Sequence, residues 1–228
     1  MSLYETIFTR RSMRQYDETP LDAAALSEVQ NYLDGAKQLP GQSARFEIVG
    51  KDKLKGGSAP YAILAYTDDS EEAWVNIGYT LQGVDLWLQS RGYGSVWSGM
   101  AAPLEKDPEY RILLGFGPTS VPLRTSENDF KRKTITEVSN EDNAVARAAR
   151  LAPSAVNLQP WFLTFRDGKV EVRANVRGIG RVLPGRLWLF DIGIVLKHVE
   201  LALMHEGKTV TGLSIKGTGK NVAVAVSY

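Results

Sequence analysis

The 228-residue sequence predicts an α+β fold made of two related halves in one chain. Three observations predict it. Helical patterns alternate with short β-branched and aromatic runs that are bounded by Gly, Ser and Pro. Two long apolar helical runs align with each other without a gap, and the same order of elements flanks both runs. The predicted halves are residues 1–125 and residues 126–228, which we expect to form one compact unit.

The first half begins with two helices. We expect, in chain order, helices over residues 4–11 and 22–36, strands over 45–50 and 61–66, a long helix over 71–91, a glycine-led segment over 95–100 and a strand over 111–116. Asp22 is placed to cap the second helix. The long helix has apolar residues on nearly every face, which predicts that it is buried. The polar residues 119–143 are the expected linker.

The second half repeats this order of elements. We expect a helix over residues 141–152, a hairpin of strands over 161–166 and 169–175 that turns at Asp167 and Gly168, a second apolar helix over 187–206, and two final strands.

The two long helices can be superposed at a shift of 115 residues. Gly78 then coincides with Gly193, and Asp85 coincides with Glu200. Apolar helices resemble each other by composition, but the matching order of flanking elements favours an internal duplication. The sequence therefore predicts a monomer that acts as a pseudo-dimer, with the two long helices at the interface between its halves.

The composition excludes several classes of protein. The formal net charge of +1 gives no support to nucleic-acid binding, and no run of eighteen apolar residues predicts a membrane span. The N-terminal residues lack the pattern of a secretory signal, so we expect a cytoplasmic protein. The sequence has no cysteine and only two histidines, which is too few for an ordinary zinc site. Redox chemistry would therefore need a bound cofactor.

The first candidate segment is basic. Arg10, Arg11, Ser12 and Arg14 lie within five residues at the end of a predicted helix. Guanidinium groups suit a phosphate, and a serine hydroxyl suits a sugar or a ribityl chain. Taken alone, the segment fits a solvated basic turn better than a ligand site.

Two further segments carry polar or small residues. Residues 152–161 offer Ser154, Asn157 and Gln159 between two prolines, which suits the edge of a heterocycle, although an ordinary loop would look the same. Residues 94–100 contain small residues that would let backbone amides approach a flat ring, although the pattern also fits a simple strand entry.

Together the three segments resemble the nitroreductase family of FMN-dependent oxidoreductases. The resemblance rests on Arg-Arg-Ser-x-Arg at residues 10–14, on Ala-Pro-Ser-x-x-Asn-x-Gln-Pro-Trp at 152–161 and on Gly-x-Gly-Ser-x-Trp-x-Gly at 92–99. It resembles most the duplicated, single-chain members of the family from thermophilic bacteria. The resemblance implies a nitroreductase-like α+β fold with FMN between the two halves.

The resemblance also implies which residues bind FMN. Arg10 and Arg11 would hold the phosphate, Ser12 the ribityl chain, and Arg14 would approach the pyrimidine side of the ring. The contacts from the other half would be Pro153, Ser154, Ala155 and Asn157. The contacts at flavin N5 would come from the turn that contains Trp97, Ser98, Gly99 and Met100.

Lys131 and Arg132 are ambiguous. They resemble the basic tail that contacts the FMN phosphate in the family, and this is the interpretation that we favour. The same residues also echo the segment around Arg10, and could be its degenerate repeat or a solvated run of charges.

The order of the motifs departs from the family pattern. The proline-asparagine-tryptophan loop usually precedes the tryptophan turn, whereas here it follows it. The corresponding early residues 39–46 lack the asparagine and the tryptophan, and residues 207–212 lack the tryptophan turn. The sequence therefore predicts one complete FMN site per chain and one eroded site.

The function implied by the resemblance is an NAD(P)H-dependent reductase of nitroaromatic, quinone or similar electrophilic small molecules. Hydride transfer through a flavin needs no acid or base from the protein, so no side chain is assigned as catalytic. Arg14 is the expected cation for the negative charge of the reduced ring. Two alternatives stay open at this point: a non-catalytic FMN-binding or flavin-sensing module, and a structural pseudo-dimer without a cofactor.

Overall fold

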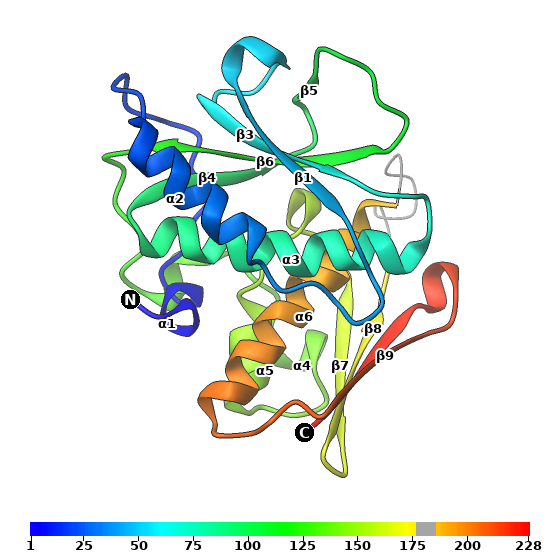
Figure 1. The fold of residues 1–228 in the computed structure, drawn as a ribbon. Coiled ribbons are helices and arrows are strands. Elements are labelled where there is room, and N and C mark those ends of the chain that lie inside the picture. The colour runs from blue at the N-terminus through cyan, green and yellow to red at the C-terminus, as the bar shows by residue number, and fades with distance from the viewer. Residues whose placement is uncertain (177–185) are drawn as a thin grey trace.

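Two four-stranded antiparallel sheets flank a pair of long helices that cross in the middle of the molecule (Figure 1). The structure is a computed structural model that describes residues 1–176 and 186–228. The long helices are α3 (Glu71–Ser90) and α6 (Leu187–His205). The predicted α+β fold class is confirmed.

The first sheet has the strand order β1-β3-β6-β4. Its strands are β1 (Arg45–Gly50), β3 (Tyr61–Tyr66), β4 (Tyr93–Ser98) and β6 (Tyr110–Pro118). A separate two-stranded ribbon pairs β2 (Leu54–Lys55) with β5 (Ala102–Pro103). The helices of this part of the chain are α1 (Leu3–Ile7), α2 (Ala23–Asp34) and the 3-10 turn η1 (Lys51–Lys53).

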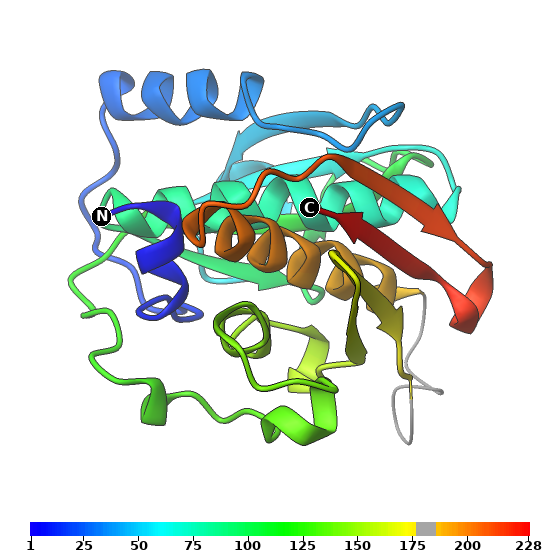
Figure 2. The same ribbon diagram turned by 90° about the horizontal axis from the view of Figure 1, so that it is seen from below.

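The second sheet has the strand order β7-β8-β10-β9. Its strands are β7 (Trp161–Arg166), β8 (Lys169–Ala174), β9 (Gly212–Lys216) and β10 (Ala223–Ser227). The other elements are η2 (Glu127–Asp129), α4 (Ile135–Val138), α5 (Ala144–Arg150), η3 (Ala155–Asn157) and η5 (Gly219–Asn221). α1 packs on both long helices, and α5 packs on α6 (Figure 2).

Several predicted boundaries were wrong. The first helix ends at Ile7 rather than at residue 11, because the chain then turns to bond along β4, where the Met13 amide donates to the Ser95 carbonyl at 2.9 Å. The helix predicted from residue 141 begins after Asn143, whose side chain caps the Ala146 amide at 2.9 Å. The predicted linker 119–143 contains η2 and α4. Asp22 caps α2 as predicted, at 2.7 Å from the Ala25 amide.

The two sheets share one connectivity. In each, an antiparallel pair of strands is followed by a long helix and then by two strands, and the last strand of the chain segment lies between its two neighbours in the sheet. A duplication would produce this match. The duplication and the division at residue 125 stay predictions.

Backbone meets backbone where the long helices cross. A Cβ atom on Gly78 would lie 2.1 Å from the carbonyl oxygen of Phe190, and one on Gly193 would lie 2.0 Å from that of Val75. The two glycines are the pair that the 115-residue shift superposes. Only glycine leaves room for this approach, so each helix carries a glycine at the point where it crosses the other.

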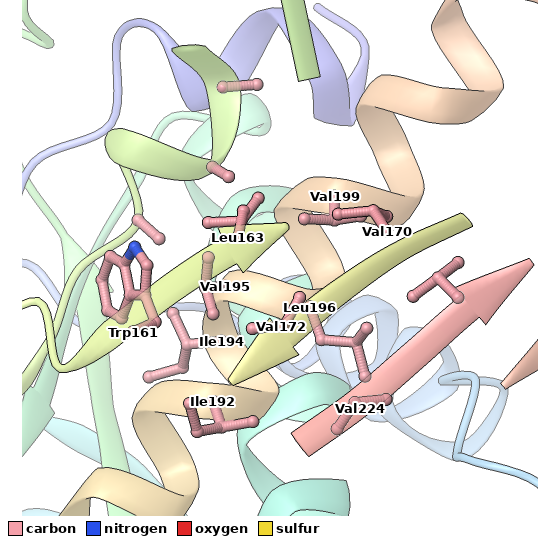
Figure 3. Close-up of a cluster of buried hydrophobic side chains, with 14 of the residues drawn as sticks. Trp161, Leu163, Val170, Val172, Ile192, Ile194, Val195, Leu196, Val199 and Val224 are labelled. Carbon is pink, nitrogen blue, oxygen red and sulfur yellow. The ribbon is translucent and has the colours of Figure 1, made fainter. Parts of the chain in front are cut away.

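The larger apolar core lies between α6 and the second sheet (Figure 3). Leu163 and Val172 of the sheet pack with Val195 and Val199 of the helix, and all four side chains are fully buried. Full burial of such a side chain contributes about 1.5–3 kcal/mol. Among the described residues, no helix is both long enough and apolar enough to cross a membrane.

Candidate functional site

Arg10 is a buried arginine whose guanidinium has donors without a hydrogen-bond partner among the described residues. Its side chain is 1% exposed, and its Nε lies 2.9 Å from Oδ2 of Asp85 on α3. Nε lies within ion-pair distance of Asp85 but is not aligned for a hydrogen bond, and both Nε and Nη2 are buried without a hydrogen-bond partner among the described residues. A buried donor without a partner costs about 1–3 kcal/mol, so this group is arranged to meet an acceptor.

Asp85 fixes the position of Arg10. Its Oδ1 accepts a hydrogen bond from the Ser95 hydroxyl at 2.6 Å and from the Gln89 amide at 3.3 Å, and its Oδ2 accepts from the Gln82 amide at 3.1 Å. Asp85 is fully buried. The carboxylate is therefore held from several sides, and the guanidinium can present its free Nη2 in one direction.

Further arginines gather near Arg10. Burial and the neighbouring Arg10 and Arg11 lower the pKa of Arg124 to about 10. Burial, followed by Arg10, Arg124 and Arg150, lowers the pKa of Arg132 to about 10. Neither Arg124 nor Arg132 forms an ion pair within the described part of the chain. Arg10 pairs with Asp85, and Arg150 lies 3.6 Å from Glu127, so the cluster holds more guanidinium groups than acidic partners. An excess of like charges held together is typical of an anion site.

The loop after α5 closes onto Arg132. The guanidinium of Arg132 donates to Oδ1 of Asn157 at 2.8 Å and to the Leu151 carbonyl at 3.1 Å. The Asn157 amide donates in turn to the Lys131 carbonyl at 2.8 Å. The two sequence segments that were predicted to meet at one ligand, 131–132 and 153–157, therefore lie in direct contact.

This loop is strained. Val156, Asn157 and Gln159 have φ angles of 43°, 60° and 47°, in the left-handed region that disfavours β-branched residues in particular. Val156 is also 71% exposed. Such strain costs about 1–3 kcal/mol per residue and clusters at ligand-binding sites, which makes this loop a functional candidate.

Asp191 anchors the loop from α6. Its Oδ1 accepts a hydrogen bond from the Ala155 amide at 2.9 Å, while its buried Oδ2 has no partner among the described residues. Burial raises the pKa of Asp191 to about 8, so the carboxyl is mostly protonated at neutral pH. On α3, Asn76 occupies the superposed position and accepts from the Leu39 amide at 2.8 Å.

We expect Asp191→Asn to abolish one component of the pH dependence of stability. The unfolded carboxyl ionises near its ordinary pKa of 3.8, whereas the folded one keeps its proton to about pH 8. The native state thus holds the extra proton, and wild-type stability falls as pH rises from about 4 to 8. Relative to wild type, the variant should gain stability with a slope that approaches about 1.4 kcal/mol per pH unit between these limits. Urea unfolding at both pH values measures this, and parallel pH profiles would contradict it.

The end of β4 is connected to α5 through the buried side-chain amide of Gln82. Trp97 Nε1 donates to Gln82 Oε1 at 3.2 Å, and Gln82 Nε2 lies 3.3 Å from His198 Nε2. His198 Nδ1 lies 3.0 Å from the Ala148 carbonyl and must be the donor there, so Nε2 accepts from Gln82. Burial lowers the pKa of His198 to about 3, which keeps the imidazole neutral.

The predicted residues differ in how far the structure brings them together. Arg11 donates through its guanidinium to the Pro122 carbonyl at 3.1 Å, Ser12 is half-buried, and Arg14 is exposed. Pro153 is buried. The Ser154 hydroxyl accepts a hydrogen bond from the backbone N–H of Gln159 at 2.8 Å, so it is engaged within its own loop.

The predicted turn residues lie at the end of β4, and several residues around the arginine cluster were not predicted. Gly99 and Met100 are exposed beyond the end of β4, and Ser98 is half-buried. Sequence reasoning missed Arg124, Arg150, Gln82, Asp85 and Asp191 as part of the site. The superposition of Asp85 with Glu200 was the signal for one of them, since an acidic residue inside an apolar helix needs a buried partner. The described residues contain no group of three His, Cys, Asp or Glu side chains able to hold a metal ion.

Comparison with known proteins points to one family. A family model described as "Putative TM nitroreductase" matches residues 2–203. A solved "putative nitroreductase" from Thermotoga maritima has 21% sequence identity and a TM-score of 0.72, over 100% of this chain and 94% of that one. At this identity the likeness shows the fold. No curated protein matches the chain.

Two other solved structures are similar over part of the chain. A "putative nitroreductase in complex with FMN" from Desulfovibrio desulfuricans has 18% identity and a TM-score of 0.48, over 62% of this chain and 96% of that one. A "Putative NADH dehydrogenase/NAD(P)H nitroreductase" from Parabacteroides distasonis has 16% identity and a TM-score of 0.48, over 62% of this chain and 98% of that one.

Proposed function

The chain belongs to the family described as "Putative TM nitroreductase", and from this premise we propose that it is an FMN-dependent oxidoreductase. In this proposal it takes hydride from NADH or NADPH and reduces nitroaromatic, quinone or similar electrophilic small molecules. It acts in the cytoplasm as a monomer whose halves form a pseudo-dimer. The family membership supports the oxidoreductase role, and the arginine cluster supports the choice of cofactor.

The observation that carries the proposal is the set of unpaired donors at the arginine cluster. Arg10 Nη2, Arg132 Nε and Arg150 Nε are buried without hydrogen-bond partners in the described part of the chain. A phosphate monoester is a dianion with three acceptor oxygens, which suits converging guanidinium groups. We assign Arg10 and Arg132 to the phosphate, and we add Arg124, whose charge acts on Arg132.

The remaining predicted residues would hold the ring and the ribityl chain. Ser12 lies two residues beyond Arg10, and Ala155 and Asn157 would contribute from the strained loop. Arg14, whose side chain is exposed, would supply the positive charge for the reduced ring. When bound, FMN supplies the hydride acceptor and donor, and the residues of this chain bind and orient it without moving a proton.

One FMN per chain is part of the proposal. At the position superposed on Asp85, Glu200 accepts hydrogen bonds from Lys37 at 2.5 Å, from Lys197 at 2.8 Å and from the Tyr79 hydroxyl at 2.7 Å. None of these groups is among the unpaired buried atoms of the described residues. An internal ion pair thus closes the second position, and this supports an eroded site.

Arg132→Gln should weaken FMN binding by about 10–100-fold, because a hydrogen bond to a charged group contributes about 1.5–3 kcal/mol. Riboflavin, which lacks the phosphate, should be weakened much less than FMN, because only the lost bond from Arg132 to Asn157 acts on both flavins. Arg166→Gln, at an exposed position on β7, is the matched control and should bind FMN as wild type does. Fluorescence titration of the apo-protein with both flavins measures this.

Three outcomes separate the proposals. Failure of the wild type to retain flavin would contradict the FMN assignment. Equal weakening of FMN and riboflavin by Arg132→Gln would contradict the phosphate assignment. If FMN binds tightly but neither NADH nor NADPH bleaches it under anaerobic conditions, the alternative function applies. That alternative is a non-catalytic flavin-binding module, and the closed position at Glu200 is the observation that favours it.

A further inference from the structure

The connection between the first two strands differs between the halves. β7 and β8 are joined by the tight turn at Asp167 and Gly168. β1 and β3 are joined by residues 51–60, which form η1, then β2, then a turn with two glycines. β2 pairs with β5, which directly follows the turn at residues 98–101. The longer connection of the first half therefore lies against the turn that we assign to the flavin ring.

The middle of the turn at residues 98–101 has little packing of its own, whereas Ala101 at its end is buried in a small apolar cluster. Met100 is 95% exposed. A Cβ atom on Gly99 would meet nothing within 4 Å. Gly99 has no side chain and the side chain of Met100 is exposed, so neither residue fixes the backbone here. The position of this backbone depends on what lies beneath it.

Two glycines of the connection lie beneath this turn. A Cβ atom on Gly56 would lie 2.9 Å from the Met100 carbonyl oxygen, and one on Gly57 would lie 3.0 Å from the Ala101 Cβ. Both glycines have positive φ angles, 76° and 72°, which other residues rarely adopt. The Lys51 ammonium donates to the carbonyls of both, which holds this pair of residues in place.

The same connection reaches a second part of the candidate site. The Ser58 hydroxyl donates to the Arg14 carbonyl at 2.9 Å. Residues 51–58 thus touch the backbone of Met100 and Ala101 and the backbone of Arg14. The two contacted segments, Arg14 and residues 100–101, are more than eighty residues apart in the sequence.

We infer that residues 51–58 are a positioning element, which sets the backbone of the turn at 98–101 and of Arg14 for the flavin ring. The inference rests on the proposed FMN site. Backbone groups beside a flavin ring tune its electronics and its affinity, so displacement of this backbone changes both. The second half has only a two-residue turn at this place, which accounts for why it builds no such site.

The test compares two glycines of nearly equal conformation. Gly56→Ala and Gly41→Ala both place a Cβ at positive φ, 76° and 73°, but the Cβ at Gly41 would meet nothing within 4 Å. Both variants carry the same backbone strain, and only Gly56→Ala pushes on the Met100 carbonyl. We expect Gly56→Ala to bind FMN roughly ten-fold more weakly and to shift its reduction potential, because small displacements of positioning groups have effects of this size or larger. Gly41→Ala should match wild type in both.

Amide hydrogen exchange of the apo-protein tests the inference without flavin. Residues 98–101 should exchange faster in Gly56→Ala than in Gly41→Ala. Equal exchange, equal FMN affinity and equal potential in the two variants would overturn the inference while leaving the proposed function intact. Failure of the wild type to bind FMN would instead overturn the proposed function, and the exchange comparison would still decide whether the connection positions the turn.

A second pair of variants avoids added strain. Lys51→Met removes the bonds to the Gly56 and Gly57 carbonyls, and Lys53→Met at an exposed neighbouring position is its control. If Gly56→Ala does not fold, Lys51→Met should still give faster exchange at residues 98–101 and weaker FMN binding than Lys53→Met. No difference between the two lysine variants would then overturn the inference.

Discussion

Gly78→Ala should cost the protein on the order of 3 kcal/mol of its free energy of unfolding, or more. The added Cβ would lie 2.1 Å from the Phe190 carbonyl oxygen, and the obstacle is backbone that no rotamer change can move. The two long helices would have to separate, and both cores pack on them. Gly193→Ala should have a comparable effect, since its Cβ would lie 2.0 Å from the Val75 carbonyl.

Gly83→Ala is the matched control on the same helix. A Cβ there would lie 3.6 Å from Lys197 Cε, an ordinary contact with the end of a flexible side chain. Alanine is the better helix former by roughly 1 kcal/mol, so this variant should be as stable as wild type or slightly more stable. Urea unfolding of the three proteins measures the difference. Equal losses in Gly78→Ala and Gly83→Ala would mean that the crossing tolerates a Cβ.

Asp85→Asn should cost about 3–5 kcal/mol, because it leaves the buried charge of Arg10 without its counter-ion. Both side chains are at most 1% exposed, and the Asp85 carboxylate also accepts from Ser95 at 2.6 Å. Asp142→Asn removes the acid of an exposed pair with Arg147, and there we expect little change. Thermal and urea unfolding check both variants.

The double variant Arg10→Leu/Asp85→Leu separates structure from ligand binding. Replacing both charges with apolar residues should restore most of the stability that Asp85→Asn loses. If Arg10 holds the phosphate, the double variant should still bind FMN at least ten-fold more weakly than wild type, with unchanged riboflavin binding. Recovery of both stability and FMN affinity would show that Arg10 serves only as the partner of Asp85.

Elements with strong local signals were predictable to the residue. The strands at residues 45–50, 61–66 and 161–166 match β1, β3 and β7, because β-branched and aromatic runs bounded by turn residues leave few alternatives. The long helices end within one residue of their predicted ends. The helix predicted over residues 4–11 stops early, because its end is decided by hydrogen bonds to β4, eighty residues away.

Some residues of the candidate site were predictable from the sequence and others were not. The motifs around Arg10 and Asn157 and the pair of Lys131 and Arg132 were visible in the sequence, because guanidinium, amide and hydroxyl groups suited to one ligand recur at short spacing. The residues that support them were not visible. Gln82 and Asp191 lie within apolar helices, and their partners come from distant segments.

The sequence by itself determined the fold class, the two matching series of elements and the family, because hydrophobic periodicity, turn residues and short motifs act locally along the chain. Only the tertiary structure decided three things. Gly78 and Gly193 meet at one helix crossing, and residues 51–58 lie beneath the turn at 98–101. Arg10 forms an ion pair with Asp85 and still has a buried donor without a partner among the described residues. Each depends on which atoms come within a few ångströms across large separations in sequence, and burial then decides whether a charge or a Cβ can exist there.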